Sequence, residues 1–295
     1  MGYQILSMSS HCRITLVLLI VVTGVLLISL PTHPALARQA VSQTVYLGFD
    51  RNDYPGDQNL PALRKTFDYS GYWLNNPPGA KSNSWLGKRQ TLESAGFGFL
   101  VLFNGRTDAQ IKSSGSAAAQ GRSDAQGAVA QARKEGFSAL TTVFLDQEEG
   151  GRLLPEQKAY LFAWVDQVIS SGLNAGVYCS AVPFQEGNGT MVNTAEDIRE
   201  NAGKRQIAFW VVNDACPPSP GCAFPKQAPA TSNSGFRFAD VWQYAQSPRR
   251  KDVAISCLNY SSDANCYPPG IDPKLRLHVD VNAAISKDPS HGRSW

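Results

Sequence analysis

Eight short apolar segments alternate, over most of this chain, with segments that have the composition of helices. The apolar segments are rich in β-branched and aromatic residues and end in polar or glycine-containing loops, as buried strands do. They lie at 45–50, 67–74, 97–103, 141–145, 174–180, 206–214, 240–245 and 277–285, and helices are expected at 85–95, 123–135, 155–171 and 194–202. This order favours an α/β fold, a parallel (β/α)8 barrel of the TIM type, irregular in its last quarter where the loops look non-helical.

The alternative fold with the same alternation is an open doubly wound sheet. Such a sheet is expected to have a glycine-rich phosphate turn after its first strand, and the sequence GFDRNDYPG, which begins at Gly48, has no GxGxxG pattern. The length also suits one barrel, which takes about 250 residues. We therefore expect a barrel domain at 45–286 and a tail at 287–295, with no interdomain linker.

The first 37 residues have the features of a secretory signal peptide. Arg13 precedes an apolar run at 14–30, and Ala35-Leu36-Ala37 forms a small-residue cleavage pattern. Cleavage after Ala37 would leave a short leader at 38–44 and a secreted or extracytoplasmic protein without stable membrane association. An uncleaved anchor is the alternative, although the run is near the short end of a membrane span, which takes ~17 to 25 residues.

The net charge of the chain indicates which partners it can bind, and its cysteines indicate the compartment in which it folds. The formal net charge of +3 is too mild to indicate nucleic-acid binding, so no nucleic-acid partner is expected. Cys216 and Cys222 flank the sequence PPSPG, and Cys257 and Cys266 flank a polar loop, so two local disulfides are geometrically easy in an oxidising compartment. Cys179 lies in the apolar run GVYCS and is expected to be a buried free thiol.

The strand at 141–145 runs directly into three acids, Asp146, Glu148 and Glu149. Because residues i and i+2 of a strand point the same way, Asp146 and Glu148 are expected to share a face. Two neighbouring carboxylates repel, which raises the pKa of one and leaves the other ionised, so that a proton donor lies beside an anion. The alternative is that these acids cap the next helix or solvate a loop.

In a parallel barrel the C-terminal ends of all strands meet at one face, where substrates bind. The acids expected at or near those ends are Asp50, Asp146, Glu148, Asp214 and Asp280, and the aromatic residues are Tyr178, Trp210, Trp242 and Tyr244. Carboxylates ringed by aromatic faces suit a sugar. Core packing is the alternative reading for Trp210, whereas Trp242, Gln243 and Tyr244 as a block are expected to contact the substrate.

Other chemistries find few suitable residues. After residue 37 the histidines are His278 and His291, which are too few for a histidine-based metal site and make a Ser/His triad improbable. No CxxC pair offers a zinc site, and the acids do not follow EF-hand spacing, although an all-carboxylate Ca²⁺ site remains an alternative. We expect no metal and no cofactor.

Four motifs, in their order along the chain, resemble those of family 25 glycoside hydrolases, the lysozymes that cleave peptidoglycan. They are Gly48-Phe49-Asp50, Asp146-Gln147-Glu148, Trp242-Gln243-Tyr244 and Val279-Asp280-Val281-Asn282. The segments YSGYWL, LESAGF and DAQGAVAQARKEGF look even more like the secreted glycoside-hydrolase-like TIM-barrel domain related to those lysozymes, long classed as a domain of unknown function. The resemblance covers residues 46–285.

The resemblance implies a glycoside hydrolase of the lysozyme (muramidase) type that acts on peptidoglycan or a related amino-sugar polymer. It implies that Glu148 is the general acid, and that Asp50, Asp146 and Asp280 position substrate, hold Glu148 protonated or stabilise an oxocarbenium-like transition state. Substrate contacts are expected from Tyr178, Trp210, Asp214, Trp242, Gln243, Tyr244 and Asn282. Retention of configuration could proceed through a carboxylate nucleophile or through the N-acetyl group of the substrate.

Two features depart from the lysozyme pattern. The third strand ends in Phe103-Asn104-Gly105-Arg106, and two cysteine-bearing insertions, 216–235 and 247–273, are expected near the active rim. The alternative function is a non-catalytic carbohydrate-binding or cell-wall-associated module on the same barrel. A carboxylate pair around Glu148 with a shifted pKa and an open groove would favour the enzyme, whereas a groove plugged by the loop between Cys216 and Cys222 would favour the binding module.

Overall fold

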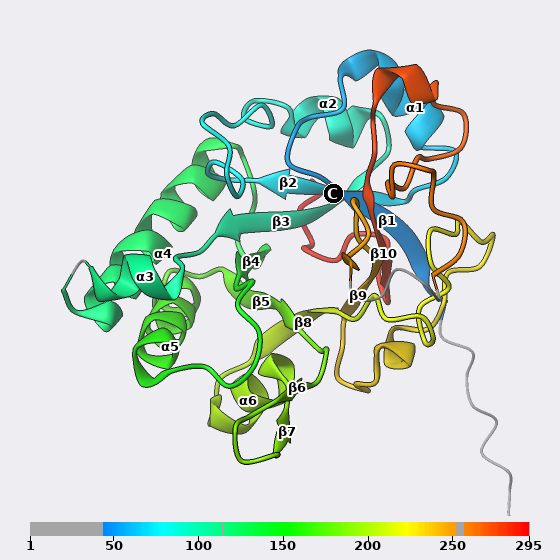
Figure 1. Ribbon diagram of the computed structural model, residues 1–295. Helices are drawn as coiled ribbons and strands as arrows, with labels where there is room; N and C mark the ends of the chain where they lie inside the picture. The colour runs from blue at the N-terminus through cyan, green and yellow to red at the C-terminus, as the bar shows by residue number, and fades with distance from the viewer. Residues whose placement is uncertain (1–43, 114, 252–256, 295) are drawn as a thin grey trace, which may run out of the picture. The chain divides into compact units, whose positions relative to one another are not determined.

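The computed structural model describes residues 44–113, 115–251 and 257–294, and eight strands of this part of the chain close into a barrel (Figure 1). In order around the barrel they are β1 (Tyr46–Asp50), β10 (Asp280–Ala284), β9 (Val241–Ala245), β8 (Ile207–Val212), β5 (Asn174–Ser180), β4 (Thr142–Asp146), β3 (Gly98–Asn104) and β2 (Tyr69–Trp73). Each expected strand is present, which confirms the (β/α)8-type barrel. The expected signal peptide and its cleavage site lie outside the described residues.

Strand β10 is the exception to the parallel order. The other seven strands run parallel to their neighbours in the barrel, whereas β10 is antiparallel to both β1 and β9. The parallel direction expected for the last strand is therefore wrong. Asp280 begins β10, and it pairs in register with Asp50, which ends β1. Because β10 runs in the reverse direction, its first residue, Asp280, lies at the same rim of the barrel as Asp50.

Helices cover the barrel from β2 to β8 (Figure 1). They are α1 (Leu60–Leu63), α2 (Arg89–Ser94), α3 (Asp108–Lys112), α4 (Ala117–Lys134), α5 (Pro155–Ser170) and α6 (Thr194–Asn201), with 3-10 turns at Asp57–Asn59, Thr231–Ser234 and Pro273–Leu275. Along β9, β10 and β1 the covering layer is coil from the two insertions, which confirms the irregular last quarter (Figure 1). None of the helices in the described ranges combines the length and apolarity needed to cross a membrane.

Two disulfides join the insertion after β8 to the insertion after β9. They link Cys216 to Cys257 and Cys222 to Cys266, so the expected local pairing is wrong. Since β8 and β9 are neighbours, the insertions that follow them lie backbone to backbone: the Cys222 N–H donates to the carbonyl of Leu258 at 3.1 Å. Cys179 is a buried free thiol, as expected.

The segment expected as a tail forms hydrogen bonds across the N-terminal ends of β3 and β4. The backbone N–H groups of Phe99 and Thr142 donate to the Asp288 carboxylate and the Ser290 carbonyl, both at 2.8 Å. A Cβ atom at Gly98 would lie 2.0 Å from the carbonyl oxygen of Lys287, so this close approach requires glycine. The segment therefore closes the end of the barrel opposite the acidic rim.

Candidate active site

The four carboxylates expected to be catalytic line one pocket at the C-terminal end of the parallel strands. Asp50 ends β1, Asp146 ends β4, Glu148 lies in the loop after β4, and Asp280 begins β10. The pocket has a volume of about 60 Å³, and its other lining residues are Asn52, Trp73, Pro78, Leu102, Tyr178, Trp210, Gln243 and Gln246. The barrel therefore brings together acids that are up to 230 residues apart in the sequence.

The pocket adjoins an open groove of about 380 Å³. Glu148, Tyr178 and Gln246 line both, and the groove continues along Gly150, Ser180, Val182, Val212 and Arg250. No residue between Cys216 and Cys222 contributes to this lining, so that loop does not plug the groove. A larger hollow, of about 550 Å³, lies on the outer surface of α5 and contains the single acid Asp166, which is paired with Arg205.

Gln243 connects two of the carboxylates. Its side-chain amide Nε2 donates to Asp50 Oδ1 at 3.1 Å and to Asp280 Oδ2 at 3.2 Å, and its Oε1 accepts from the Tyr178 hydroxyl at 2.6 Å. The residue is 1% exposed, so these contacts are shielded from water. Because both polar atoms of its side chain are already bonded, in three hydrogen bonds, Gln243 orients the carboxylates and Tyr178 rather than presenting a free amide.

A second amide donates to the same oxygen of Asp50. Asn282 Nδ2 donates to Asp50 Oδ1 at 2.7 Å, and Asn282 Oδ1 accepts from the indole of Trp210 at 2.9 Å. Gly71 on the neighbouring strand leaves the space that Asp50 needs, since a Cβ atom there would lie 2.8 Å from the Cβ of Asp50. Asp50 is therefore fixed by packing as well as by hydrogen bonds.

Burial raises the pKa of every carboxyl group in the pocket. The pKa of Asp50 rises to about 6, because the effect of burial exceeds that of its hydrogen bonds from Asn282 and Gln243. Burial, followed by the charges of Glu148 and Asp50, raises the pKa of Asp146 well above its usual value, and burial together with the charge of Asp50 does the same for Asp280. Desolvation also raises the pKa of Glu148.

Asp146 and Glu148 differ in their access to solvent. Asp146 is 6% exposed and its Oδ1 has no hydrogen-bond partner within the described part of the chain, whereas the Glu148 side chain is exposed at the mouth of the pocket. Glu149 points elsewhere, because its carboxylate accepts from the Asp108 N–H at the start of α3 at 3.0 Å. Glu149 therefore binds the start of an earlier helix, α3, and not the backbone at the start of the next helix, α5, as the capping alternative expected.

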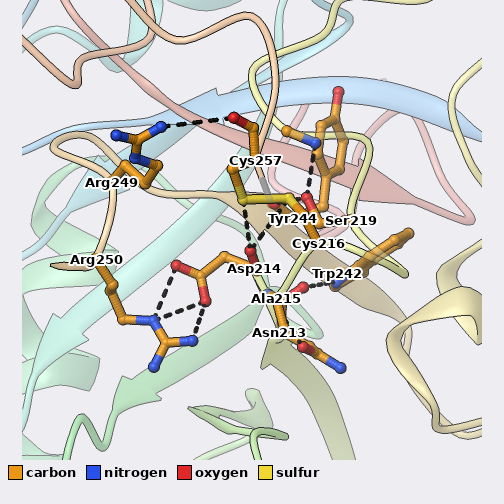
Figure 2. Close-up of a disulfide and its surroundings, with 11 residues drawn as sticks. Asn213, Asp214, Ala215, Cys216, Ser219, Trp242, Tyr244, Arg249, Arg250 and Cys257 are labelled. Carbon is orange, nitrogen blue, oxygen red and sulfur yellow. Dashed lines mark hydrogen bonds and ion pairs between the residues drawn. A yellow bond between two sulfur atoms is a disulfide. The ribbon is translucent and has the colours of Figure 1, made fainter. Parts of the chain in front are cut away.

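Four residues expected to contact substrate, Asp214, Trp242, Tyr244 and the fully buried Asn282, lie outside the pocket and groove lining. Asp214 is 1% exposed and forms an ion pair with Arg250, with 2.6 Å between Oδ1 and Nη2, beside the Cys216–Cys257 disulfide (Figure 2). Trp242 and Tyr244 alternate with Gln243 along β9, so they point to the opposite face and are fully buried. Their polar atoms bond to the carbonyls of Asn213 and Ala223, at 2.9 and 2.7 Å, so both serve in packing.

Trp210 and Tyr178 do line the pocket, but they expose little surface. Trp210 is 1% exposed and Tyr178 is 7% exposed, with ring centroids 4.4 Å apart. The core-packing alternative therefore describes most of the Trp210 side chain. The ring of large exposed aromatic faces expected around the acids is not formed by these residues.

Several lining residues were not predicted from the sequence. Asn52 lies two residues after Asp50, and Gln246 lies three residues after Gln243, so proximity to the motifs could have indicated both. Trp73 ends β2 within the YSGYWL segment. Arg250 carried no sequence signal, because it reaches the groove from the insertion after β9. Within the described ranges, no group of three or more His, Cys, Asp or Glu side chains could hold a metal ion.

Comparison with known proteins places the chain in a family. No match is found among the curated proteins. An uncharacterised protein of B. stearothermophilus aligns over 81% of this chain and 95% of its own, with 20% identity and a TM-score of 0.51. The Streptococcus pneumoniae virulence factor GHIP, a glycosyl hydrolase 25, aligns over 83% of this chain and 90% of its own, with 13% identity and a TM-score of 0.50.

The Tat-secreted protein Rv2525c of Mycobacterium tuberculosis, solved with L-tartrate, aligns over 82% of this chain and 95% of its own, with 14% identity and a TM-score of 0.45. At their identities, the two matches with TM-scores of 0.50 and 0.51 speak for the fold alone. The family model described as "Rv2525c-like, glycoside hydrolase-like domain" matches residues 69–217, about half of the chain. This chain is therefore a member of the Rv2525c-like, glycoside hydrolase-like domain family, related in fold to family 25 glycoside hydrolases.

Proposed function

We propose that this protein is an exported glycoside hydrolase that cleaves peptidoglycan or a related amino-sugar polymer, with Glu148 as the general acid. The observation that carries the proposal is the convergence of Asp50, Asp146, Glu148 and Asp280 on one pocket beside an open groove. Glycosidic hydrolysis needs a protonated carboxyl group to donate to the leaving oxygen and an ionised carboxylate to stabilise the positive charge at the anomeric carbon. A cluster of carboxyl groups with raised pKa values supplies both.

Glu148 suits the acid role because of its place and its protonation. It lies at the junction of pocket and groove and is exposed, so a glycosidic oxygen can reach it. Desolvation raises its pKa, which favours the protonated form that a general acid requires. In the proposed reaction Glu148 gives its proton to the leaving oxygen as the glycosidic bond breaks.

Asp50 suits the role of the ionised partner. With a pKa of about 6 it is mostly ionised at neutral pH, and its two amide donors favour that charged form. Asp146 and Asp280, whose pKa values burial also raises, would position the substrate, and in their ionised forms they would favour the protonated form of Glu148 and stabilise an oxocarbenium-like transition state. Gln243 and Asn282 act as positioning residues through Asp50.

Two disulfides between the insertions support a site of action in an oxidising compartment outside the cytoplasm. Cleavage of an N-terminal signal peptide after Ala37 remains part of the proposal. A wall polysaccharide is the substrate expected for such a location, and neither a nucleic acid nor a membrane partner is proposed.

The test compares the purified protein with two neighbouring variants, Glu148→Gln and Glu149→Gln. Each is incubated with peptidoglycan and with chitin-type oligosaccharides, and the release of reducing ends is followed. Loss of the general acid should lower the rate by roughly 10²- to 10⁴-fold in Glu148→Gln. Glu149→Gln should keep its turnover, because Glu149 faces α3 rather than the pocket.

Equal loss in the two variants would contradict an acid role specific to Glu148. If the parent protein binds these glycans without turnover, and Glu148→Gln binds equally well, the enzyme proposal is wrong. The barrel would then be a carbohydrate-binding module.

A further inference from the structure

The groove beside Glu148 leads to a small hairpin at the barrel rim. The hairpin pairs β6 (Phe184–Gln185) with β7 (Met191–Val192). Two chain segments line the groove at this side, one through Glu148 and Gly150 and the other through Ser180 and Val182. The first segment continues into Gly151 and the second into Phe184, so the chain runs from both walls of the groove toward the hairpin.

Phe184 and Gly151 meet where these segments continue. A Cβ atom at Gly151 would lie 3.2 Å from Cδ1 of the Phe184 ring, and Gly151 has a φ of +85°, which favours glycine. The bare backbone of Gly151 therefore supports one side of the ring. This contact places the ring against the residue that follows Gly150 of the groove lining.

The hairpin is also tied to the acidic loop by polar contacts. Arg152 Nε donates to Glu186 Oε1 in the hairpin turn at 2.8 Å, and the Gly151 carbonyl itself accepts from the buried Thr194 hydroxyl at the start of α6 at 2.9 Å. The first contact joins the hairpin to the acidic loop next to Gly151, and the second fixes the Gly151 backbone to α6. Both contacts hold the backbone against which the ring packs.

Phe184 exposes 56% of its surface, and it is the only exposed Phe, Tyr or Trp in 44–113, 115–251 and 257–294. The aromatic residues expected to bind sugar at this rim are instead nearly or fully buried. An exposed aromatic face suits the apolar C–H surface of a sugar ring and offers no hydrogen bond of its own. Because the ring packs against Gly151, next to Gly150 of the groove lining, a ligand that reached it from the pocket would have to extend along the groove.

We propose that Phe184 is a stacking platform for a sugar unit of a glycan strand that extends from the pocket along the groove. This inference rests on the proposed function and adds that the protein prefers long strands to short oligosaccharides. Phe184 would add affinity through a sugar several units from the cleaved bond. It would take no part in the bond cleavage.

The test uses full-length protein carrying Glu148→Gln, so that glycans are bound without turnover. Affinities for β-1,4-linked N-acetylglucosamine oligomers of increasing length are measured by calorimetry for this parent and after adding Phe184→Ala, Phe184→Trp or Met191→Ala. Met191 is a matched control because it is 57% exposed on the same hairpin, but pairs with Gln185 and so lies on the opposite face from Phe184.

Phe184→Ala should weaken binding of the longest oligomer by about three- to tenfold and leave the dimer unchanged. Phe184→Trp and Met191→Ala should bind like the parent. If the parent and Phe184→Ala bind long oligomers equally well, the platform is wrong and the proposed function stands. The same conclusion follows if Phe184→Ala weakens binding of the dimer as much as binding of the longest oligomer. Absence of any glycan binding by the parent would overturn the proposed function together with the platform. A concentration-dependent dimer that Phe184→Ala abolishes in sedimentation would assign the ring to self-association instead.

Discussion

Asp50 and Asp280 are paired in register on antiparallel neighbouring strands, and one amide group, Gln243 Nε2, donates to both carboxylates. This pairing exists because β10 reverses direction within an otherwise parallel barrel. The shared donor lowers the repulsion between two buried acids without neutralising them. Burial still raises the pKa of each, so both carboxyl groups of the proposed catalytic pocket hold a proton to higher pH than an exposed aspartate does.

Replacing the shared donor should weaken both the fold and the reaction. In Gln243→Leu, Asp50 loses one of its two amide donors, Asp280 loses a donor, and the Tyr178 hydroxyl loses its acceptor. We expect the free energy of unfolding to fall by about 1–3 kcal/mol, as for buried polar groups that lose a partner. Urea unfolding measures the loss, with the exposed helix residue substitution Gln90→Leu as control. Equal stability of the two variants would contradict the bridging role.

The raised pKa of Asp50 predicts a stability that falls as the pH rises. A carboxyl group with a pKa of about 6 in the folded state, against about 3.9 in the unfolded chain, favours folding most below pH 4. That contribution is lost as the pH rises from about 4 through 6, and the total loss amounts to about 3 kcal/mol. Asp50→Asn should therefore be more stable than the parent protein at pH 8 and nearly equal to it at pH 4.

Denaturant unfolding at both pH values checks this, with the exposed Asp53→Asn as control. An Asp50→Asn protein that is less stable than the parent at pH 8 would show that its hydrogen bonds outweigh the cost of burying its charge. The same substitution should lower glycosidase activity, because it removes the ionised partner of the general acid.

The disulfide pattern can be tested directly. Proteolytic mapping under non-reducing conditions should recover peptides linked through Cys216–Cys257 and Cys222–Cys266. Each bridge closes a loop of more than 40 residues, so removal of one pair by serine substitution should cost roughly 2–5 kcal/mol of stability. Recovery of the short pairs Cys216–Cys222 and Cys257–Cys266 would contradict the arrangement of the two insertions.

The C-terminal segment should stabilise the barrel without affecting catalysis. Asp288 accepts hydrogen bonds from the backbone N–H groups of Phe99, Gly292 and Arg293, at 2.8, 3.2 and 3.1 Å. Asp288→Ala should lower the free energy of unfolding by about 3 kcal/mol, because three buried or half-buried donors lose a charged acceptor. Lys287→Ala, at an exposed neighbouring position, should change it by less than about 0.5 kcal/mol.

Hydrolysis of glycan by folded Asp288→Ala protein should match that of the parent, because the segment lies at the opposite end of the barrel from Glu148. A specific loss of turnover in a fully folded variant would show that the two ends of the barrel are coupled.

The sequence by itself determined the strand order and the acids of the site. Period-two and apolar patterns are local properties, so the strands at β1 to β5 and at β8 to β10 could be located from composition alone. The position of Asp50 and Asp146 at strand ends followed from the same patterns. Burial of Cys179 was equally local, because its neighbours in GVYCS are apolar or small.

Only the tertiary structure decided which way β10 runs, which cysteines meet and which face of β9 carries the site. A strand's direction depends on the path of the chain before it, and the long coil insertion ahead of β10 allows either direction. Disulfide partners depend on which loops lie together, here because β8 and β9 are neighbours. Trp242 and Tyr244 share the WQY motif with Gln243, but alternation along the strand turns them outward beneath the insertions, where burial rather than substrate contact determines their role.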